Sequence, residues 1–304
     1  MHEWNGKRIG GSQIIEWNGI RIRQKQVTIM ALLYKYRGLT NEHLRNLIYG
    51  HLDSEKSGQK ANISRFVKDL RDKKLINSSS CFPYSKELIH YLSQKGVDFI
   101  VTELNISKDN DPLNGFKDVY GLFDANTLKP PLNNIEHQMM FLDTVIKLEK
   151  NGFATRHNLY AVKRYKYLKE YPNYMLELEG KVRPDGEVYK NGFAPIEIDT
   201  GTERFDHLLK KFNNYRRYFE YLDSINEPKK WKIILFKTKA GSNKNLLTDT
   251  RWQTIMRAAF AGLSNYIWNT KVVNIDSPLE KNSDYLINNL DILEAFNLEL
   301  PPEH

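Results

Sequence analysis

The order of strand and helix patterns after residue 180 constrains the fold more than any other feature of the sequence. The patterns run in the order strand 181–189, strand 192–199, helix about 203–224, strand 231–236, helix about 246–268 and strand 271–275. A hairpin followed by alternating helices and strands forms a mixed sheet flanked by helices. The sequence therefore predicts an α+β or α/β fold for this part of the chain.

The first hundred residues show a different order of elements. Apolar spacing predicts helices at about 24–37, from Thr40 and at about 60–74, then strands at 75–77 and 88–92, and a last helix that ends near Leu104. A short second helix, a turn, a basic third helix and a hairpin form the order of a winged helix-turn-helix. We therefore expect residues 23–104 to be a winged helix domain that binds DNA.

The charge of the chain is concentrated in the same region. Residues 1–104 carry 17 Lys and Arg against 10 Asp and Glu, while the remaining residues carry 28 against 27. A local excess of cations attracts polyanions, although a solvated surface can show the same excess. The expected base readers are Asn62, Ser64 and Arg65, and the expected backbone contacts are Lys56, Lys60, Lys68, Arg71 and Lys73. Docking of a protein by the winged helix is the alternative.

Two short near-repeats open the chain. Residues 3–9 and 16–22 both contain Glu-Trp-Asn-Gly, and Asn-Gly favours a tight hairpin turn. This N-terminal arm, 1–22, lies on DNA or packs on the domain as a clasp. The clasp is favoured because Trp4 and Trp17 need cover from solvent.

Prolines and polar residues predict a linker over 105–133, with a short ordered piece at 116–123. The second domain is expected over 134–304 and begins with a helix at about 135–150. A basic tract at 156–169 interleaves tyrosines with cations. Such a tract lines a groove for a nucleic-acid strand or forms a surface helix, and the second reading is slightly favoured.

Composition excludes several classes of protein. No run of about 18 apolar residues is present, and the N-terminus lacks the apolar run of a secretion signal, so we expect no membrane association. The single cysteine, Cys81, fits a reducing cytoplasm and excludes cysteine-based zinc or iron–sulfur sites. The chain has no phosphate-binding loop of an ATP-driven helicase. It also has no His-x-His cluster paired with a distant tyrosine, as a tyrosine relaxase would need.

Three carboxylates fall on the two strands of the predicted hairpin. Asp185 lies on the first strand, and Glu197 and Asp199 lie two residues apart on the second, so their side chains share a face. Carboxylates this close repel each other unless a cation or protons compensate. Hard oxygen ligands of this kind suit Mg²⁺ or Mn²⁺.

These residues carry a resemblance to a known family. Pro184-Asp185 followed by Glu197-x-Asp199, with a helix on either side, resembles the restriction-endonuclease-like core of the Pro-Asp…(Asp/Glu)-x-Lys nucleases. The winged helix joined to Arg183-Pro-Asp185 and to residues 197–203, with Lys211 and Tyr215 downstream, is similar to the replication-relaxation family of plasmids and other mobile elements. The resemblance covers about residues 24–275.

The resemblance implies roles for individual residues. Asp185 and Glu197 would hold the metal, and Glu136 would supply a further carboxylate from the preceding helix. The lysine of the motif is replaced by Asp199, which cannot supply positive charge, so Lys210 or Lys211 would have to provide it. Without such a replacement the core would be an inactive scaffold. His137 and His207 are further candidates for the site, although packed or solvated histidines are commoner.

The implied function is binding of double-stranded DNA in plasmid replication or in relaxation for transfer, with metal-dependent nicking as an added activity. A relaxase or replication protein would be its partner, and a homodimer is compatible with the sequence. The alternative is a transcriptional regulator whose inactive nuclease-like domain dimerises or senses a ligand.

Overall fold

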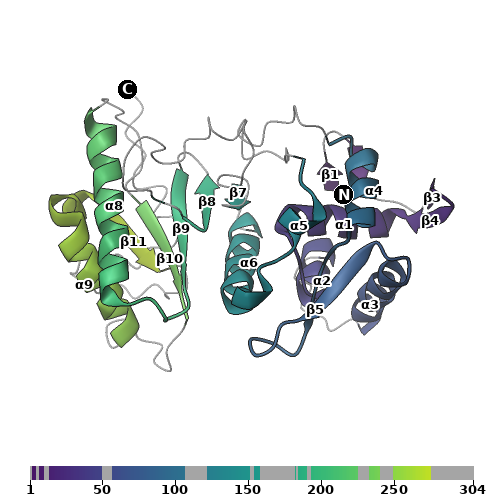
Figure 1. Cartoon of the computed structure of the whole chain (residues 1–304), viewed down its shortest axis with the longest axis horizontal. Coiled ribbons are helices and arrows are strands. Elements are labelled where there is room, and N and C mark those ends of the chain that lie inside the picture. Colours follow the sequence, from purple (N-terminus) through teal and green to yellow (C-terminus); the bar gives the residue numbers. More distant parts are fainter. Residues whose placement is uncertain are drawn as a thin grey trace. The chain divides into compact units, whose positions relative to one another are not determined.

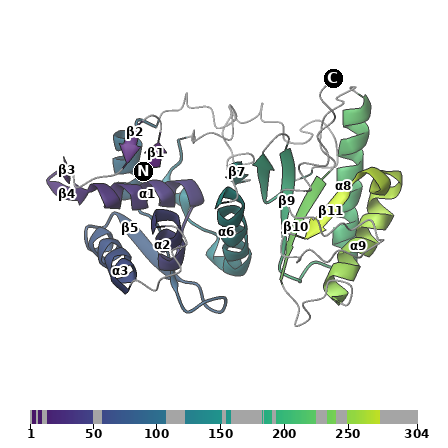
Figure 2. The ribbon, with the colours of Figure 1, turned by 180° about the vertical axis from the view of Figure 1, so that it is seen from behind.

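The computed structural model of the chain describes residues 2–4, 7–9, 14–49, 57–106, 122–150, 154–157, 182, 184–189, 193–224, 233–239 and 249–274. The chain divides into two compact units, Met1–Ile146 and Lys147–His304 (Figures 1 and 2). The division falls inside α6 (Ile135–Lys150), whereas the sequence predicts a second domain that contains the whole of this helix. No helix in these described ranges is both long and apolar enough to cross a bilayer.

The first unit follows the predicted order of elements. It contains the hairpins β1 (His2–Trp4)–β2 (Lys7–Ile9) and β3 (Ile14–Trp17)–β4 (Ile20–Arg23), helices α1 (Gln24–Tyr36), α2 (Asn41–Tyr49) and α3 (Ser57–Asp72), the hairpin β5 (Ile76–Ser80)–β6 (Leu88–Leu92), and α4 (Gln94–Glu103). The helix α5 (Ala125–Leu128), a 3-10 turn at Leu132–Asn134 and most of α6 complete it. Each near-repeat at the N-terminus therefore forms the expected hairpin.

One apolar row of α3 faces the core of the first unit. Ile63, Val67 and Leu70 are almost fully buried, at the spacing of one helix face. The chain turns closely at Gly96 on α4, where an added Cβ would lie 2.0 Å from the carbonyl oxygen of Leu75. Because any side chain at position 96 would collide with this carbonyl, glycine is required for α4 to pack this closely on Leu75.

Part of the expected linker packs on α1. The backbone N–H of Phe123 donates to the hydroxyl of Tyr34 at 2.9 Å, and the Phe123 side chain is buried. Asp124 caps α5, because its carboxylate accepts from the N–H of Thr127 at 2.6 Å. Residues 122–134 therefore belong to the packed first unit, while the ordered piece expected at 116–123 lies largely outside the described residues.

Polar contacts explain why α6 joins the first unit. Asp143 on α6 accepts from His43 Nε2 on α2 at 2.8 Å and from the hydroxyl of Tyr84, between β5 and β6, at 2.9 Å. Both partners lie far from Asp143 in sequence. Periodicity within the helix predicts the helix itself and carries no information about these contacts.

The second unit contains one five-stranded sheet in the order β11-β10-β9-β8-β7. The strands are β7 (Ala154–His157), β8 (Gly186–Tyr189), β9 (Phe193–Asp199), β10 (Ile233–Thr238) and β11 (Lys271–Asn274). β7, β8 and β9 pair antiparallel, and β9, β10 and β11 pair parallel, so the sheet is mixed as predicted. β7 was not predicted as a strand, because four residues are too few to show a reliable alternation.

Helices α8 (Phe205–Ser224) and α9 (Thr250–Leu263) cover one face of this sheet (Figures 1 and 2). The ring of Phe236 on β10 lies 5.6 Å from that of Phe212 on α8 and 6.5 Å from that of Trp252 on α9. The two helices meet at Gly262, where an added Cβ would lie 2.5 Å from Cβ of Phe212.

Candidate functional site

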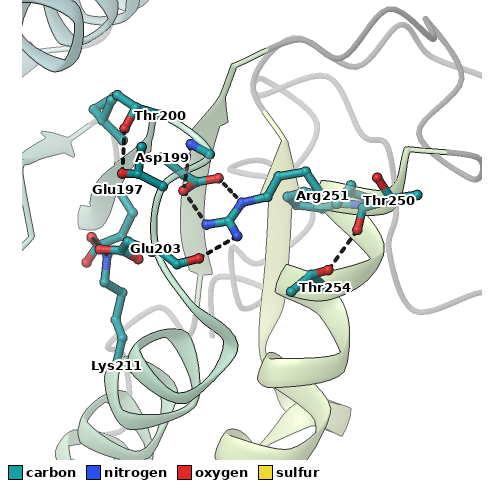
Figure 3. A network of polar contacts seen from close by, with 12 residues as sticks. Glu197, Asp199, Thr200, Glu203, Lys211, Thr250, Arg251 and Thr254 are labelled. Carbon is teal, nitrogen blue, oxygen red and sulfur yellow. Dashed lines mark hydrogen bonds and ion pairs between the residues drawn. The ribbon is translucent and has the colours of Figure 1, made fainter.

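A cluster of charged residues lies where β9 ends (Figure 3). Glu197 and Asp199 are 2% and 1% exposed and face α8 and α9, while the alternating Ile196 and Ile198 are also buried. The parallel strands β9 and β10 end on this side of the sheet. The carboxyl edge of parallel strands is where open α/β sheets most often bind ligands.

The Glu197 carboxylate receives a donor on each oxygen. Lys211 Nζ donates to Oε2 at 2.8 Å, and the hydroxyl of Tyr215 donates to Oε1 at 2.5 Å. Lys211 and Tyr215 are four residues apart on α8, so they reach the same carboxylate from one helix face. Lys211 Nζ also lies 3.2 Å from Oε1 of Glu203. A buried carboxylate requires such compensation.

The ionisation of this pair follows from burial and from neighbouring charge. Burial raises the pKa of Glu197, and the charge of Asp185 raises it further, against the opposing effects of Lys211 and Tyr215. Burial alone would lower the pKa of Lys211, but the carboxylates of Glu197 and Glu203 outweigh it, so the pKa of this lysine is raised. Lys211 therefore carries a positive charge at neutral pH and supplies a fixed cation to the site.

Asp185 directly precedes β8 and continues its register, which places it across from Glu197 of β9. Its backbone N–H donates to the carbonyl of Ile196 at 2.9 Å, which continues the β8–β9 ladder by one residue. Its carboxylate accepts from the N–H of Ile198 at 2.8 Å. The structure thus brings Asp185, Glu197 and Lys211 together, and the charge of Asp185 acts on the pKa of the other two.

Asp199 has a different partner. The guanidinium of Arg251 donates to it through Nε at 2.6 Å and through Nη2 at 2.5 Å, and Nη1 donates to the carbonyl of Glu203 at 2.7 Å. The N–H of Gly201 also donates to Asp199, at 3.2 Å. A two-pronged arginine–carboxylate pair is strong and directional. Asp199 therefore joins the β9–α8 loop to the first turn of α9 (Figure 3).

The donor set left for a metal is Asp185 with Glu197. In the described ranges no group of three or more His, Cys, Asp or Glu side chains is arranged to hold a metal ion. One or two carboxylates with waters and substrate phosphate are, however, what Mg²⁺ commonly uses. Each carboxylate oxygen has two lone pairs, so the hydrogen bonds at Glu197 leave acceptor capacity. The chemistry of these two residues fits Mg²⁺ or Mn²⁺.

The other predicted residues of this site fall into three groups. Lys210 is exposed, so Lys211 alone of the two lysines points into the cluster. Glu136 and His137 lie on α6 within the first unit. His207 is exposed, with Nε2 4.0 Å from a carboxylate oxygen of Asp206. Arg183 and the basic tract from 158 to 169 lie outside the described residues.

Sequence reasoning missed Arg251 and gave Glu203 no role. Glu203 is quoted in the motif that follows Glu197, and its distance from Lys211 is set by the loop between β9 and α8. Arg251 is 52 residues from Asp199, and nothing in its local pattern marks it as a partner. The i, i+4 spacing of Lys211 and Tyr215 is the local signal that sequence provided.

The outer face of α3 is cationic. Its exposed residues include Lys60, Ser64, Arg65, Lys68 and Arg71. Arg65 Nη2 donates to Oδ1 of Asn62 at 3.0 Å, which joins two of the expected base readers.

Two residues that were expected to contact the DNA backbone, Lys73 and Lys56, are not among these exposed residues of α3. Lys73 is half-buried and donates to Asp69 at 2.6 Å and to the carbonyl of Arg21 at 2.8 Å. Its ammonium is therefore committed within the protein. Lys56 lies outside the described residues.

Comparison with protein families identifies the family of the chain. No curated protein and no solved structure matches the chain. The profile of the replication-relaxation family matches residues 30–234, about two thirds of the 304 residues, and extends over both units from α1 into β10. The chain belongs to the replication-relaxation family.

Proposed function

We propose that this protein binds double-stranded DNA and acts in the replication of a plasmid or other mobile element, or in its relaxation for transfer. Membership of the replication-relaxation family supports the role in replication or relaxation. The observation that carries DNA binding is the outer face of α3, where Lys60, Arg65, Lys68 and Arg71 are exposed. Cations on a helix opposite a buried apolar row suit the phosphates that border a groove.

The surrounding elements support a winged helix-turn-helix. α2 and α3 pack together, and the hairpin β5–β6 follows α3 directly. In this arrangement α3 enters the major groove, with Asn62, Ser64 and Arg65 near its N-terminal half as base readers. The hairpin β5–β6 is the wing that contacts phosphate.

Binding of labelled duplexes across a range of salt concentrations tests this proposal. Lys60→Ala and Lys68→Ala should each weaken binding to all duplexes and lower the salt slope, while Arg65→Ala should weaken some sequences more than others. Lys95→Ala, an exposed cation on α4, is the matched control. If the unaltered protein binds no labelled duplex at moderate salt, the proposal is refuted.

A second candidate function is metal-dependent nicking by the second unit. It is supported by Asp185, which is hydrogen-bonded to the residues on either side of Glu197, and by the charged Lys211 bonded to Glu197. Lys211 then provides the positive charge that Asp199 cannot provide at the usual lysine position. A bound Mg²⁺ or Mn²⁺ would supply Lewis-acid activation of water and of the phosphate.

Supercoiled plasmid incubated with Mg²⁺ or Mn²⁺ tests for nicking. The nicked product should appear with the unaltered protein and disappear with Asp185→Ala and with Glu197→Gln, while Asp206→Ala, an exposed carboxylate of α8, should retain it. Cutting that persists in both site variants would refute the assignment.

The nicking assay also separates the alternative. Calorimetry measures whether Mn²⁺ binds and whether binding requires Asp185. If the protein binds DNA but neither cuts it nor binds Mn²⁺ through Asp185, a regulator with an inactive nuclease-like domain is favoured. Partnership with a relaxase or replication protein, and formation of a homodimer, belong to the proposed role.

A further inference from the structure

The hairpin β3–β4 presents a pair of arginines outside the surface assigned above to DNA. On β4, Arg21 and Arg23 are exposed and Ile22 between them is fully buried, so both arginines belong to one outward face. On the inner side, the ring of Trp17 packs edge-on against Phe99 of α4 at 5.3 Å. The hairpin therefore has an apolar face packed on the unit and a cationic face in solvent.

Hydrogen bonds fix this hairpin to the expected recognition helix. Lys73, directly after the end of α3, donates to the carbonyl of Arg21 at 2.8 Å and to Asp69 of α3 at 2.6 Å. Gln26 completes the link, because its amide donates to Asp69 at 2.6 Å and its carbonyl oxygen accepts from the N–H of Arg23 at 2.9 Å. These bonds use only backbone atoms of residues 21 and 23, so neither guanidinium group is needed to hold the hairpin in place.

The charge balance around this link is positive. The hairpin, the end of α3 and the turn after it contain the cations Arg21, Arg23, Lys68, Arg71, Lys73 and Lys74 and the acids Glu16, Asp69 and Asp72. Asp69 is already paired with Lys73, and Glu16 stands opposite Arg21 in the hairpin register. The hairpin and the end of α3 together therefore carry a net positive charge, which attracts a polyanion.

We propose that the hairpin β3–β4 is a second phosphate-binding element, in which Arg21 and Arg23 contact the DNA backbone beside the segment that α3 occupies. This inference rests on the DNA binding proposed above. A guanidinium donates two parallel hydrogen bonds to phosphate oxygens. Because the hairpin is bonded to α3, the arginine pair holds the helix in register on the duplex without reading sequence.

The double variant Arg21→Ala/Arg23→Ala tests the inference in the full chain. Binding should weaken to a similar extent for every duplex, and the slope of log K against log salt should fall by about 1.8, or about 0.9 for each lost contact. The urea midpoint should stay unchanged, because the anchoring bonds are made by the backbone. Arg21→Lys/Arg23→Lys should restore most of the slope, since it restores the charge.

The matched control is Lys95→Ala/Lys129→Ala, which removes two exposed cations of the same unit that belong to neither α3 nor β4. If the unaltered protein binds duplex and Lys60→Ala weakens it, but the arginine pair changes the slope no more than this control, the hairpin assignment alone is overturned. A loss confined to particular sequences would also overturn it. If the unaltered protein binds no duplex, the hairpin assignment fails together with the proposed function.

Discussion

The two units of this protein use charge in opposite ways. On α3 of the first unit, Lys60, Lys68 and Arg71 lie in solvent. In the second unit, Glu197 and Asp199 are almost fully buried, and each is bonded to a cation. Exposed charges cost the fold little and remain available to a partner, whereas buried charges must be compensated within the fold itself. The same substitution, lysine to alanine, should therefore act on binding in one unit and on stability in the other.

Lys211→Ala should have the largest effect on stability. It leaves Glu197 buried without its cation, and breaking such a pair typically costs about 3–5 kcal/mol in the free energy of unfolding. Urea-induced unfolding measures this loss. The double variant Glu197→Gln/Lys211→Met should recover most of it, because neither charge then remains buried. An unchanged urea midpoint in the single variant would mean that the pair is not compensating burial.

Acid should destabilise the first unit through a buried neutral side chain. His90 is 2% exposed, and burial, aided by the charge of Arg71, lowers its pKa from 6.5 to about 4. His90 therefore takes up a proton near pH 6.5 in the unfolded chain, but only near pH 4 in the native state. Stability is full above pH 6.5 and should fall by up to about 3 kcal/mol as the pH drops to 4.

Urea unfolding at pH 7 and at pH 5 measures this effect of His90. The variant His90→Phe keeps the ring volume and cannot take up the proton, so its stability should fall less over the same interval. Equal losses in the two proteins would show that other groups cause the acid sensitivity.

Arg251→Lys should have a smaller effect on the second unit. Lysine keeps the charge beside Asp199 but cannot reproduce the two-pronged contact or reach the carbonyl of Glu203 at the same time. We expect a loss of about 2 kcal/mol in the free energy of unfolding, the scale of one or two charged hydrogen bonds. Arg217→Lys on the exposed side of α8 should change stability far less. Similar losses in the two variants would show that the paired hydrogen bonds from Arg251 to Asp199 do not stabilise the second unit.

Lys68→Ala should have the smallest effect on stability and completes the comparison with Lys211→Ala. Its side chain is exposed on α3, so the free energy of unfolding should stay within about 0.5 kcal/mol of the unaltered protein. Its effect should appear in DNA binding, as a fall of about 0.9 in the salt slope. A stability loss as large as that of Lys211→Ala would end the contrast between the two units.

Much of the candidate site could be anticipated from local spacing. Glu197 and Asp199 are two residues apart on one strand, and Lys211 and Tyr215 are four apart on one helix, so each pair shares a face whatever surrounds it. The position of Lys211 rather than Lys210 in the cluster could not be anticipated. It depends on how α8 is rotated against the sheet, which is set by the packing of Phe212 against Phe236.

The boundary between the units shows the same limit. The apolar stripe of α6 predicts a helix but does not indicate the unit in which the helix packs. That outcome depends on Asp143, whose partners His43 and Tyr84 come from two other elements. The strand β7 is likewise too short to be predicted from its own residues, because it is defined by its pairing with β8.

The sequence by itself determined the order of helices and strands, the cationic face of α3 and the family of the chain, because periodicity and spacing are local properties of a polypeptide. Only the tertiary structure decided that Arg251 neutralises Asp199 and that β3–β4 is bonded to α3. Those contacts join residues about fifty positions apart. Their geometry depends on how buried surfaces pack, since a charged or polar group finds its partner only after the apolar faces have fixed the distances between elements.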